Sequence, residues 1–526
     1  MPRSGRRLPF VLTLIVSLIV ALPGILLPHG ASAQAGVTYY YRQITNIDSS
    51  VTGSVGLPVL SADGQVAVFT DSPGSQDPAT PNRVYRIGAD GSGLAEVDSF
   101  TPKCFCGTWV DLSADGSTIV STDSVQIRTT TGGSGVPILE VSSNEISSPR
   151  LTAAGDRVAF IIGRDVTVVA TGEALVRGIY VMNIDGSGLR LVAGPDQLAP
   201  LTGTTADQIG MLRLQAQGLD ISDDGSRVVF GAYVAGLQTV FSATIDGSGL
   251  VQLREPAAFV QRVAISGDGA TAAMDVLLTE TQVSELSVVP AAGRTATVLA
   301  TGLPTNQSDP IQLTQDGTQL LVAPNGLLIE TATGATTLLA APIEGVGGAH
   351  EAVIPDGLPR ATMDAAASIV LYAMRTVKCA DCVNLSEQLA VLTFATPPPN
   401  APVIENVTID PTSVVLGDNE DTFAISADVT VTAGELMGVG FSGILPNGAV
   451  DTNFGSTTLL FDDATLGDPT AGDGTYTQTG IVYVVRAAAD PGPRLIRVAA
   501  EVESADGYRT ATAVDAGVLE VTAAGA

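Results

Sequence analysis

Histidine is almost absent from this sequence. Only 2 of the 526 residues are histidine, His29 and His350, and His29 falls in an N-terminal segment that we expect to be removed. One remaining imidazole excludes every site that needs two histidine ligands. The chain also lacks a Gly-x-Ser-x-Gly elbow, because Gly440-Phe441-Ser442-Gly443-Ile444 departs from it at the last position. Two common hydrolase designs are thereby excluded.

Basic residues are scarce as well. The chain has 25 Lys+Arg against 54 Asp+Glu, a net charge of -29. Such a charge repels a phosphate backbone, so nucleic acid and anionic lipid are not expected as partners.

A long hydrophobic run occurs only at the start of the chain. Arg3, Arg6 and Arg7 precede an apolar stretch over 8–27, and small residues follow at Ala31-Ser32-Ala33. This order is typical of a signal peptide, so residues 1–33 are predicted to be cleaved and the protein to be secreted, periplasmic or on the cell surface. No stable membrane span is expected after cleavage.

Cysteine is limited to four residues, Cys104, Cys106, Cys379 and Cys382. In an exported protein the expectation is two disulfides, whose pairing the spacing leaves open. A four-thiolate metal site is the alternative.

What the sequence has in abundance is turn and strand residues, and above all a repeat. With 57 Gly and 30 Pro, the composition favours many short strands. An apolar residue, Ser or Thr, one or two further residues and Gly recur before strand-like runs, the last copy being degenerate. The seven copies are Leu60-Ser61-Ala62-Asp63-Gly64, Leu112-Ser113-Ala114-Asp115-Gly116, Leu151-Thr152-Ala153-Ala154-Gly155, Ile221-Ser222-Asp223-Asp224-Gly225, Ile265-Ser266-Gly267-Asp268-Gly269, Leu313-Thr314-Gln315-Asp316-Gly317 and Met363-Asp364-Ala365-Ala366-Ala367.

Asp-Gly suits a tight hairpin, because glycine accepts positive φ and aspartate bonds its own backbone. A second hairpin signal of the form Asp-Gly-Ser-Gly-Leu follows three copies, at 90–94, 185–189 and 246–250. Two tight turns per repeat predict four-stranded blades, and seven copies predict a seven-bladed β-propeller over residues 34–395.

The segment Ile179-Tyr180-Val181-Met182-Asn183-Ile184-Asp185-Gly186, together with the repeated turns, resembles the WD40-like (PD40) repeat of TolB-type propellers. The resemblance covers residues 38–394. It implies the fold and not an activity.

The last blade has only three strands before a Pro-rich linker at 396–402. We expect the N-terminal strand over 38–45 to supply the fourth and to close the ring, which removes an exposed sheet edge.

Connections of very different length are predicted on the two ends of the propeller. Because strands alternate in direction, the tight Asp-Gly turns share one end and the other connections share the opposite end. The long segments are 71–82, 98–108, 163–177, 193–216, 341–360 and 375–387. All four cysteines also fall there. Long loops on a rigid scaffold commonly carry binding residues, so the long-loop end is the predicted interaction surface.

Residues 403–526 continue as strands, and seven of them in about 120 residues predict an immunoglobulin-like β-sandwich. This domain resembles spacer and adhesion modules of exported bacterial proteins. Its loop carries Asp462, Asp463, Asp468 and Asp473, candidate ligands for Ca²⁺, with ordinary turn chemistry as the alternative.

The function favoured by these features is that of an exported, non-catalytic binding or scaffold protein, with a protein or a cell-surface polysaccharide as partner. A hydrolase, lactonase or glycosidase that uses carboxylates in the central channel is the alternative. Binding predicts an exposed apolar patch at the long-loop end, whereas catalysis predicts channel carboxylates with raised pKa values.

Overall fold

The computed structural model describes residues 37–47, 54–56, 58–72, 81–100, 108–212, 217–255, 258–278, 281, 283–293, 295–303, 310–323, 326–339, 360–377, 385–394, 396–417, 420–446, 448–454, 458–484 and 491–523. The predicted signal segment, all four cysteines and His350 lie outside this part. Within it, regular structure is almost entirely β-strand, so the predicted all-β fold class is confirmed. None of the described helices has the length and apolar character needed to span a membrane.

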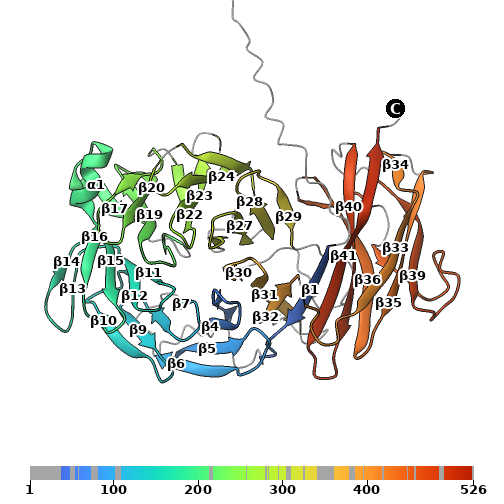
Figure 1. Ribbon diagram of the computed structural model, residues 1–526, viewed down its shortest axis with the longest axis horizontal. Helices are drawn as coiled ribbons and strands as arrows, with labels where there is room; N and C mark the ends of the chain where they lie inside the picture. The colour runs from blue at the N-terminus through green and yellow to red at the C-terminus, as the bar shows by residue number, and fades with distance from the viewer. Residues whose placement is uncertain are drawn as a thin grey trace, which may run out of the picture.

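The strands of the first 394 residues are arranged around a central channel, as in a β-propeller (Figure 1). We number the four-stranded groups 1–7 in chain order, each running outward from the channel. Among the described residues they are β3 (Val59–Leu60), β4 (Val66–Ser72), β5 (Asn82–Gly88), β6 (Ala95–Phe100); β7 (Trp109–Leu112), β8 (Ile119–Thr122), β9 (Gln126–Thr130), β10 (Val136–Glu140); β11 (Ile146–Leu151), β12 (Arg157–Ile162), β15 (Gly178–Asn183), β16 (Arg190–Ala193); β18 (Leu219–Ile221), β19 (Arg227–Val234), β20 (Leu237–Thr244), β21 (Val251–Gln252); β22 (Ala258–Ile265), β23 (Thr271–Leu278), β24 (Ser284–Pro290), β25 (Thr297–Thr301); β26 (Ile311–Leu313), β27 (Gln319–Val322), β28 (Leu327–Glu330), β29 (Thr336–Leu338); and β30 (Thr362–Met363), β31 (Ile369–Val377), β32 (Leu385–Thr393) with β1 (Thr38–Gln43). One extra strand, β2 (Ser54–Val55), pairs with β4.

Each repeated turn is held by its own side chains. In group 1, Ser61 Oγ donates to Asp63 Oδ1 at 2.6 Å and accepts from the amide of Val66 at 2.9 Å. Gly64 follows with φ of 70°, a conformation that favours glycine. In the degenerate seventh copy, Asp364 occupies the serine position and accepts from Ile369 N, while Ala367 adopts the glycine conformation with φ of 52°. The turn therefore survives the loss of its glycine.

Backbone hydrogen bonds join the seven turns into a closed ring. No pattern within a single turn predicts these bonds. Each bond runs from an amide of one turn to a carbonyl of the next, at 2.9–3.4 Å. The pairs are Asp63 to Ala114, Ala114 to Ala153, Ala153 to Asp223, Asp224 to Gly267, Asp268 to Gln315, Gln315 to Ala365 and Ala365 to Ala62. We call this the turn end of the channel.

The second turn of a group lies beside the first. The amide of Ala89 donates to Gln65 O at 2.8 Å, and that of Ile184 donates to Asp156 O at 3.1 Å. Both kinds of tight turn thus share the turn end, and the described connections over 163–177 and 193–212 lie at the opposite end.

Two of the long connections are described well enough to show regular structure. The connection within group 3 forms a hairpin of β13 (Val166–Thr167) and β14 (Ala174–Leu175), and the next contains α1 (Pro195–Thr202), η1 (Ala206–Gln208) and β17 (Ile209–Met211). The helix has proline at its first position and ends at Gly203 with φ of 65°. Figure 1 places α1, β13 and β14 at the outer rim of the ring.

The N-terminal strand β1 joins two parts of the molecule. It pairs antiparallel with β32, Tyr40 opposite Thr393, and on its other edge with β41 (Arg509–Thr522), Tyr40 opposite Thr512. One continuous sheet therefore runs from group 7 into the C-terminal strands (Figure 1).

Two sheets form the C-terminal part, packed over a shared core that contains Phe423, Phe441 and Phe454. The first sheet contains β34 (Ser413–Val415), β36 (Glu435–Ile444), β37 (Val450–Asp451), β38 (Leu459–Leu460), β40 (Gly492–Glu503) and β41; the second contains β33 (Val403–Asp410), β35 (Thr422–Thr430) and β39 (Thr475–Val482). The last strand, β41, runs over 14 residues, from Arg509 to Thr522. Its first half is rich in Ala and Thr and pairs with β1, a partner distant in sequence.

A buried polar cluster lies where β1, β41 and group 6 meet. Arg497 Nε pairs with Asp515 Oδ1 at 2.6 Å, Arg497 Nη1 donates to Leu338 O at 2.7 Å, and the guanidinium carbon lies 3.9 Å from the centre of the Tyr39 ring. Tyr39 also donates to Asp515 at 3.1 Å. Burial raises the pKa of Tyr41, which donates to Leu339 O at 2.7 Å, to about 12. We call these residues the junction cluster.

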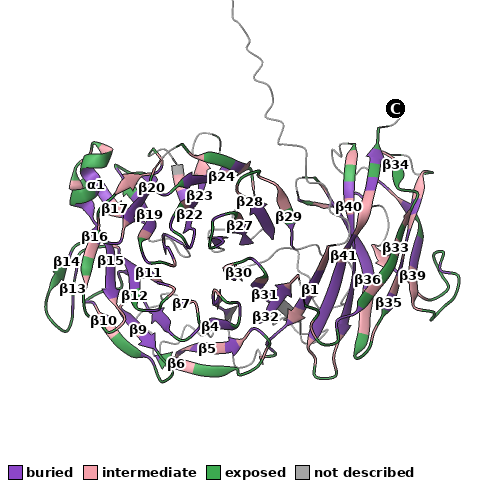
Figure 2. Ribbon diagram, viewed as in Figure 1, coloured by how far each residue is buried: buried purple, intermediate pink, exposed green. Residues whose placement is uncertain are grey.

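Most buried residues lie in the strands. Figure 2 shows buried residues along the sheets of the ring and of the C-terminal part, and exposed residues on α1 and the outer connections. The scaffold that surrounds the channel is therefore well packed.

Candidate functional site

In six of the seven groups one residue of the innermost strand lines the channel, two positions before the Ser, Thr or Asp that begins the turn. In chain order these residues are Val59, Asp111, Arg150, Asp220, Gln312 and Thr362. In group 5 the corresponding residue, Ala264, packs in the core. Groups 2, 3 and 4 contribute charge here, and groups 1, 6 and 7 contribute neutral side chains.

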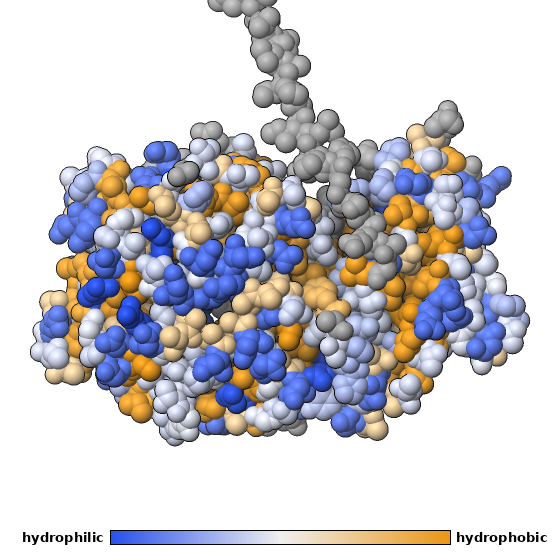
Figure 3. Space-filling model, viewed as in Figure 1, coloured by the Kyte–Doolittle hydropathy of each residue, from blue (hydrophilic) through white to orange (hydrophobic). Residues whose placement is uncertain are grey.

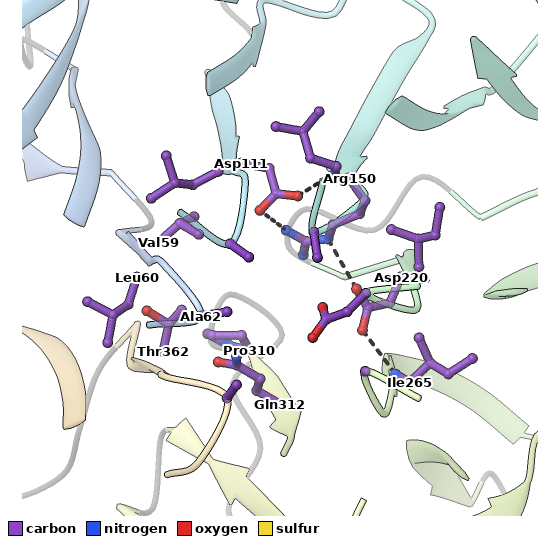
Figure 4. Close-up of a pocket in the computed structure, with 18 of the residues that line it drawn as sticks. Val59, Leu60, Ala62, Asp111, Arg150, Asp220, Ile265, Pro310, Gln312 and Thr362 are labelled. Carbon is purple, nitrogen blue, oxygen red and sulfur yellow. Dashed lines mark hydrogen bonds and ion pairs between the residues drawn. The ribbon is translucent and has the colours of Figure 1, made fainter. Parts of the chain in front are cut away.

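Arg150 lies between two carboxylates from the neighbouring groups (Figure 4). Its Nη1 is 3.9 Å from Asp111 Oδ1, and its Nε is 3.7 Å from Asp220 Oδ1. Each carboxylate also accepts a backbone amide of the following group: Asp111 from Leu151 at 2.6 Å and Asp220 from Ile265 at 2.9 Å. The two acids therefore link adjacent groups as well as lining the channel.

The pKa values of three carboxyl groups in the channel are raised. Burial raises the pKa of Asp220 to about 6, with Arg150 opposing the shift. Burial also raises the pKa of Asp111, and it raises that of Asp223 together with the nearby charges of Asp111 and Asp224. Carboxyls with such shifts are typical of functional sites, although structural networks produce them too.

The space between these residues is small. The cavity measures about 160 Å³, whereas sites for drug-sized molecules usually measure roughly 300–1,000 Å³. Ser148 lines it with φ of 51°, and its buried Oγ has no hydrogen-bond partner among the described residues. Around the central opening in Figure 3, weakly hydrophobic residues alternate with hydrophilic ones.

A separate feature lies at the end of the ring away from the repeated turns. Five large apolar side chains on the connections and strand ends of groups 3 and 4 are exposed there. They are Val169 (56%), Val176 (48%), Leu201 (44%), Tyr233 (39%) and Leu237 (46%). We call them the rim patch.

The segments that carry the rim patch are joined to one another. Arg177, next to Val176, donates to Ile209 O at 2.8 Å and to Ala206 O at 2.9 Å. β17 in turn pairs with β19, where Gly210 lies opposite Tyr233. The patch is therefore built on hydrogen-bonded structure.

Three of the four predicted calcium ligands come together. Oxygens of Asp462, Asp468 and Asp473 lie within 4.8 Å of one another. Asp463 is not part of this group, and its Oδ1 accepts the amide of Thr465 at 3.0 Å. Asp462 already accepts backbone amides, Gly474 among them at 3.0 Å.

The sequence patterns did not single out Asp111, Arg150 or Asp220. They are far apart in the chain and follow no motif. The only available signal was their common place two residues before the turn, and that position varies in chemistry from group to group.

No family model matches this chain, and no curated protein matches it either. Solved structures resemble it weakly. An oligogalacturonate lyase from Vibrio parahaemolyticus has 10% identity and a TM-score of 0.43, covering 67% of this chain and 93% of that one. A putative TolB from Agrobacterium tumefaciens has 15% identity and a TM-score of 0.33, covering 54% and 95%. TolB from Acinetobacter baumannii has 12% identity and a TM-score of 0.33, covering 57% and 62%. Likeness at this level adds nothing to what the strands themselves show.

Proposed function

We propose that this chain is an exported, non-catalytic binding protein that recognises a protein partner through the long-loop end of a seven-bladed propeller. The rim patch carries the proposal, because exposed apolar side chains on hydrogen-bonded connections are a feature of interaction surfaces. Export rests on the segment over 1–33.

The size of the channel supports the choice of surface. At about 160 Å³ it has no room for a peptide or a sugar chain, so a macromolecular partner has to be recognised outside it. Between the two partner classes, aliphatic side chains favour a protein, because a polysaccharide offers little apolar surface to them.

The test is to replace three rim residues with aspartate: Val169→Asp, Leu201→Asp and Leu237→Asp. Immobilised residues 34–526 would be used to capture partners from the proteins and polysaccharides that the producing cells export. We expect the triple variant to retain at least about tenfold less of the captured protein, since desolvating three charges opposes association. Shortening 193–216 is less suitable, because Leu198 and Ala199 belong to the core.

A matched control uses three equally exposed apolar residues elsewhere on the ring, Leu94→Asp, Val136→Asp and Val298→Asp. This variant should capture as the parent does. Equal loss in both variants, or loss in neither, would show that the rim patch is not the interface. Capture of a polysaccharide alone would overturn the partner class.

A second candidate function is hydrolysis of a small ester or lactone in the channel. The observation in its favour is Asp220, whose pKa of about 6 suits a carboxyl that exchanges protons near neutral pH. Turnover by the parent protein and none by Asp220→Asn would select this candidate.

We further propose that residues 403–526 form an immunoglobulin-like spacer whose loop binds Ca²⁺ through Asp462, Asp468 and Asp473. The convergence of their oxygens supports this proposal.

Calcium is then expected to stabilise the C-terminal part. If the dissociation constant is on the order of 10⁻⁴ M and the free Ca²⁺ concentration is about a hundred times that constant, the free energy of unfolding should rise by about 2.7 kcal/mol. Thermal unfolding with and without Ca²⁺ measures it. Mg²⁺ at equal concentration and an Asp473→Asn variant serve as controls, and both should show little or no rise in melting temperature. An identical melting temperature for the parent with and without Ca²⁺ would refute the site.

A further inference from the structure

Asp223 stands at the turn end of the channel without a positive partner. No hydrogen bond from any described residue reaches its carboxylate, and the charges closest to it are those of Asp111 and Asp224. Its backbone carbonyl is engaged in the ring of turn bonds, accepting from Ala153 at 3.0 Å. The backbone at Asp223 is therefore fixed in the ring of turns, while its half-buried carboxylate has no ion pair with a described residue.

A second acceptor lies beside it. A β-carbon on Gly267 would come within 2.4 Å of Asp223 Oδ2 and 2.1 Å of Gln315 Oε1, so both oxygens lie over this glycine. Asp223 is half-buried and Gln315 is exposed, and in this orientation the Gln315 amide turns its oxygen toward the carboxylate. A group with several N–H donors placed over Gly267 would reach both oxygens. A third unmatched group, the buried Ser148 hydroxyl, lines the same cavity.

The two sides of the cavity differ in chemistry. Asp111, Arg150 and Asp220 lie on one side in Figure 4, and Val59, Ala62 and Pro310 lie on the other. With Asp223 included, three carboxylates and one guanidinium line the cavity. Negative charge on one side and apolar surface on the other suit a molecule with a cationic head and a short hydrocarbon chain.

The size of the cavity and its charge limit the chemical class of ligand that it can bind. A volume of about 160 Å³ corresponds to about five water molecules at roughly 30 Å³ each, which excludes a sugar chain. The carboxylates disfavour an anion. A metal ion is disfavoured by geometry, because the described acids that converge closely enough for one are Asp462, Asp468 and Asp473.

We propose that the central channel binds a small aliphatic ammonium compound, its ammonium group between Asp223 and Gln315 and its chain against Val59 and Ala62. This site is independent of the rim patch and goes beyond the binding of a protein partner. The ammonium donates to both oxygens and supplies the charge that Asp223 lacks.

The experiment titrates n-butylammonium into residues 34–526 by calorimetry at about 0.15 M salt, where diffuse attraction to the acidic surface is screened. We expect saturable binding with one site. Butyrate and 1-butanol, which match the chain without the positive charge, should not bind measurably. Binding of 1-butanol as tight as that of n-butylammonium would overturn the proposal, as would failure of the cation to saturate.

Two variants locate the site. Asp223→Asn removes the charge without breaking a bond in the described structure, so its melting temperature should be no lower than that of the parent, whereas its affinity should fall at least tenfold. Gly267→Ala keeps every charge but places a methyl group where the ammonium would lie, and we expect a similar loss.

The matched control is Asp207→Asn, which makes the same charge change on exposed η1. Its affinity should stay within twofold of the parent. Equal weakening by Asp207→Asn and Asp223→Asn would show that the cation is bound by the overall charge of the protein. Unchanged affinity in both channel variants would place any binding elsewhere.

Discussion

Replacing Arg497 with methionine is expected to lower the free energy of unfolding of the C-terminal part by about 3–5 kcal/mol. The substitution removes the partner of Asp515, whose carboxylate is 4% exposed. It also leaves Leu338 O, which accepts from Arg497 Nη1 at 2.7 Å, without its donor. A buried charge and a buried carbonyl would both lose their compensation.

The same variant should weaken the contact between the ring of strands and the C-terminal part. Arg497 packs on the ring of Tyr39, and Tyr39 belongs to the strand that pairs with both β32 and β41. We expect faster amide exchange along β1 than in the parent. Urea unfolding measures the loss of stability as a lower midpoint at unchanged slope.

The control is the double variant Arg497→Met/Asp515→Leu, which removes both charges. It should regain much of the lost stability, because apolar residues of similar size often replace a buried ion pair with little penalty. A single variant that costs less than about 1 kcal/mol would contradict the role assigned to the junction cluster.

Replacing Asp220 with asparagine is expected to stabilise the protein at neutral pH. Burial raises the pKa of this carboxyl from 3.8 to about 6. The folded state therefore holds its proton more tightly than the unfolded state between those values, and the parent loses stability as the pH rises through this window. A shift of about two units corresponds to about 2–3 kcal/mol above pH 6.

The asparagine variant does not lose this stability, because asparagine carries no charge and its side-chain oxygen can still accept a hydrogen bond from the amide of Ile265. Urea midpoints at pH 4 and pH 8 test the sign: the variant should gain at pH 8 and show little difference at pH 4. Asp207→Asn, on exposed η1, should change stability by less than about 0.5 kcal/mol at either pH. A variant of Asp220 that is weaker at pH 8 would mean that its ion pair with Arg150 outweighs burial.

Local chemistry explains why the turns were predictable. Ser61, Asp63 and Gly64 bond within six residues of one another, so their spacing alone indicates the hairpin. The helix α1 was not predicted, although Pro195 and Gly203 mark its ends, because the whole segment 193–216 was interpreted as one long loop. The pairing of β41 with β1 was not predictable from local pattern either, because the two strands are far apart in the sequence.

What the sequence determined by itself is the set of features whose causes lie a few residues apart: the all-β class, the seven repeated turns and the scarcity of imidazole chemistry. Only the tertiary structure decided that those turns bond into one ring, that Arg150 lies between Asp111 and Asp220, and that Asp223 is left without a positive partner. These contacts join residues tens of positions apart, and the desolvation that shifts their pKa values exists only once the chain has closed around the channel.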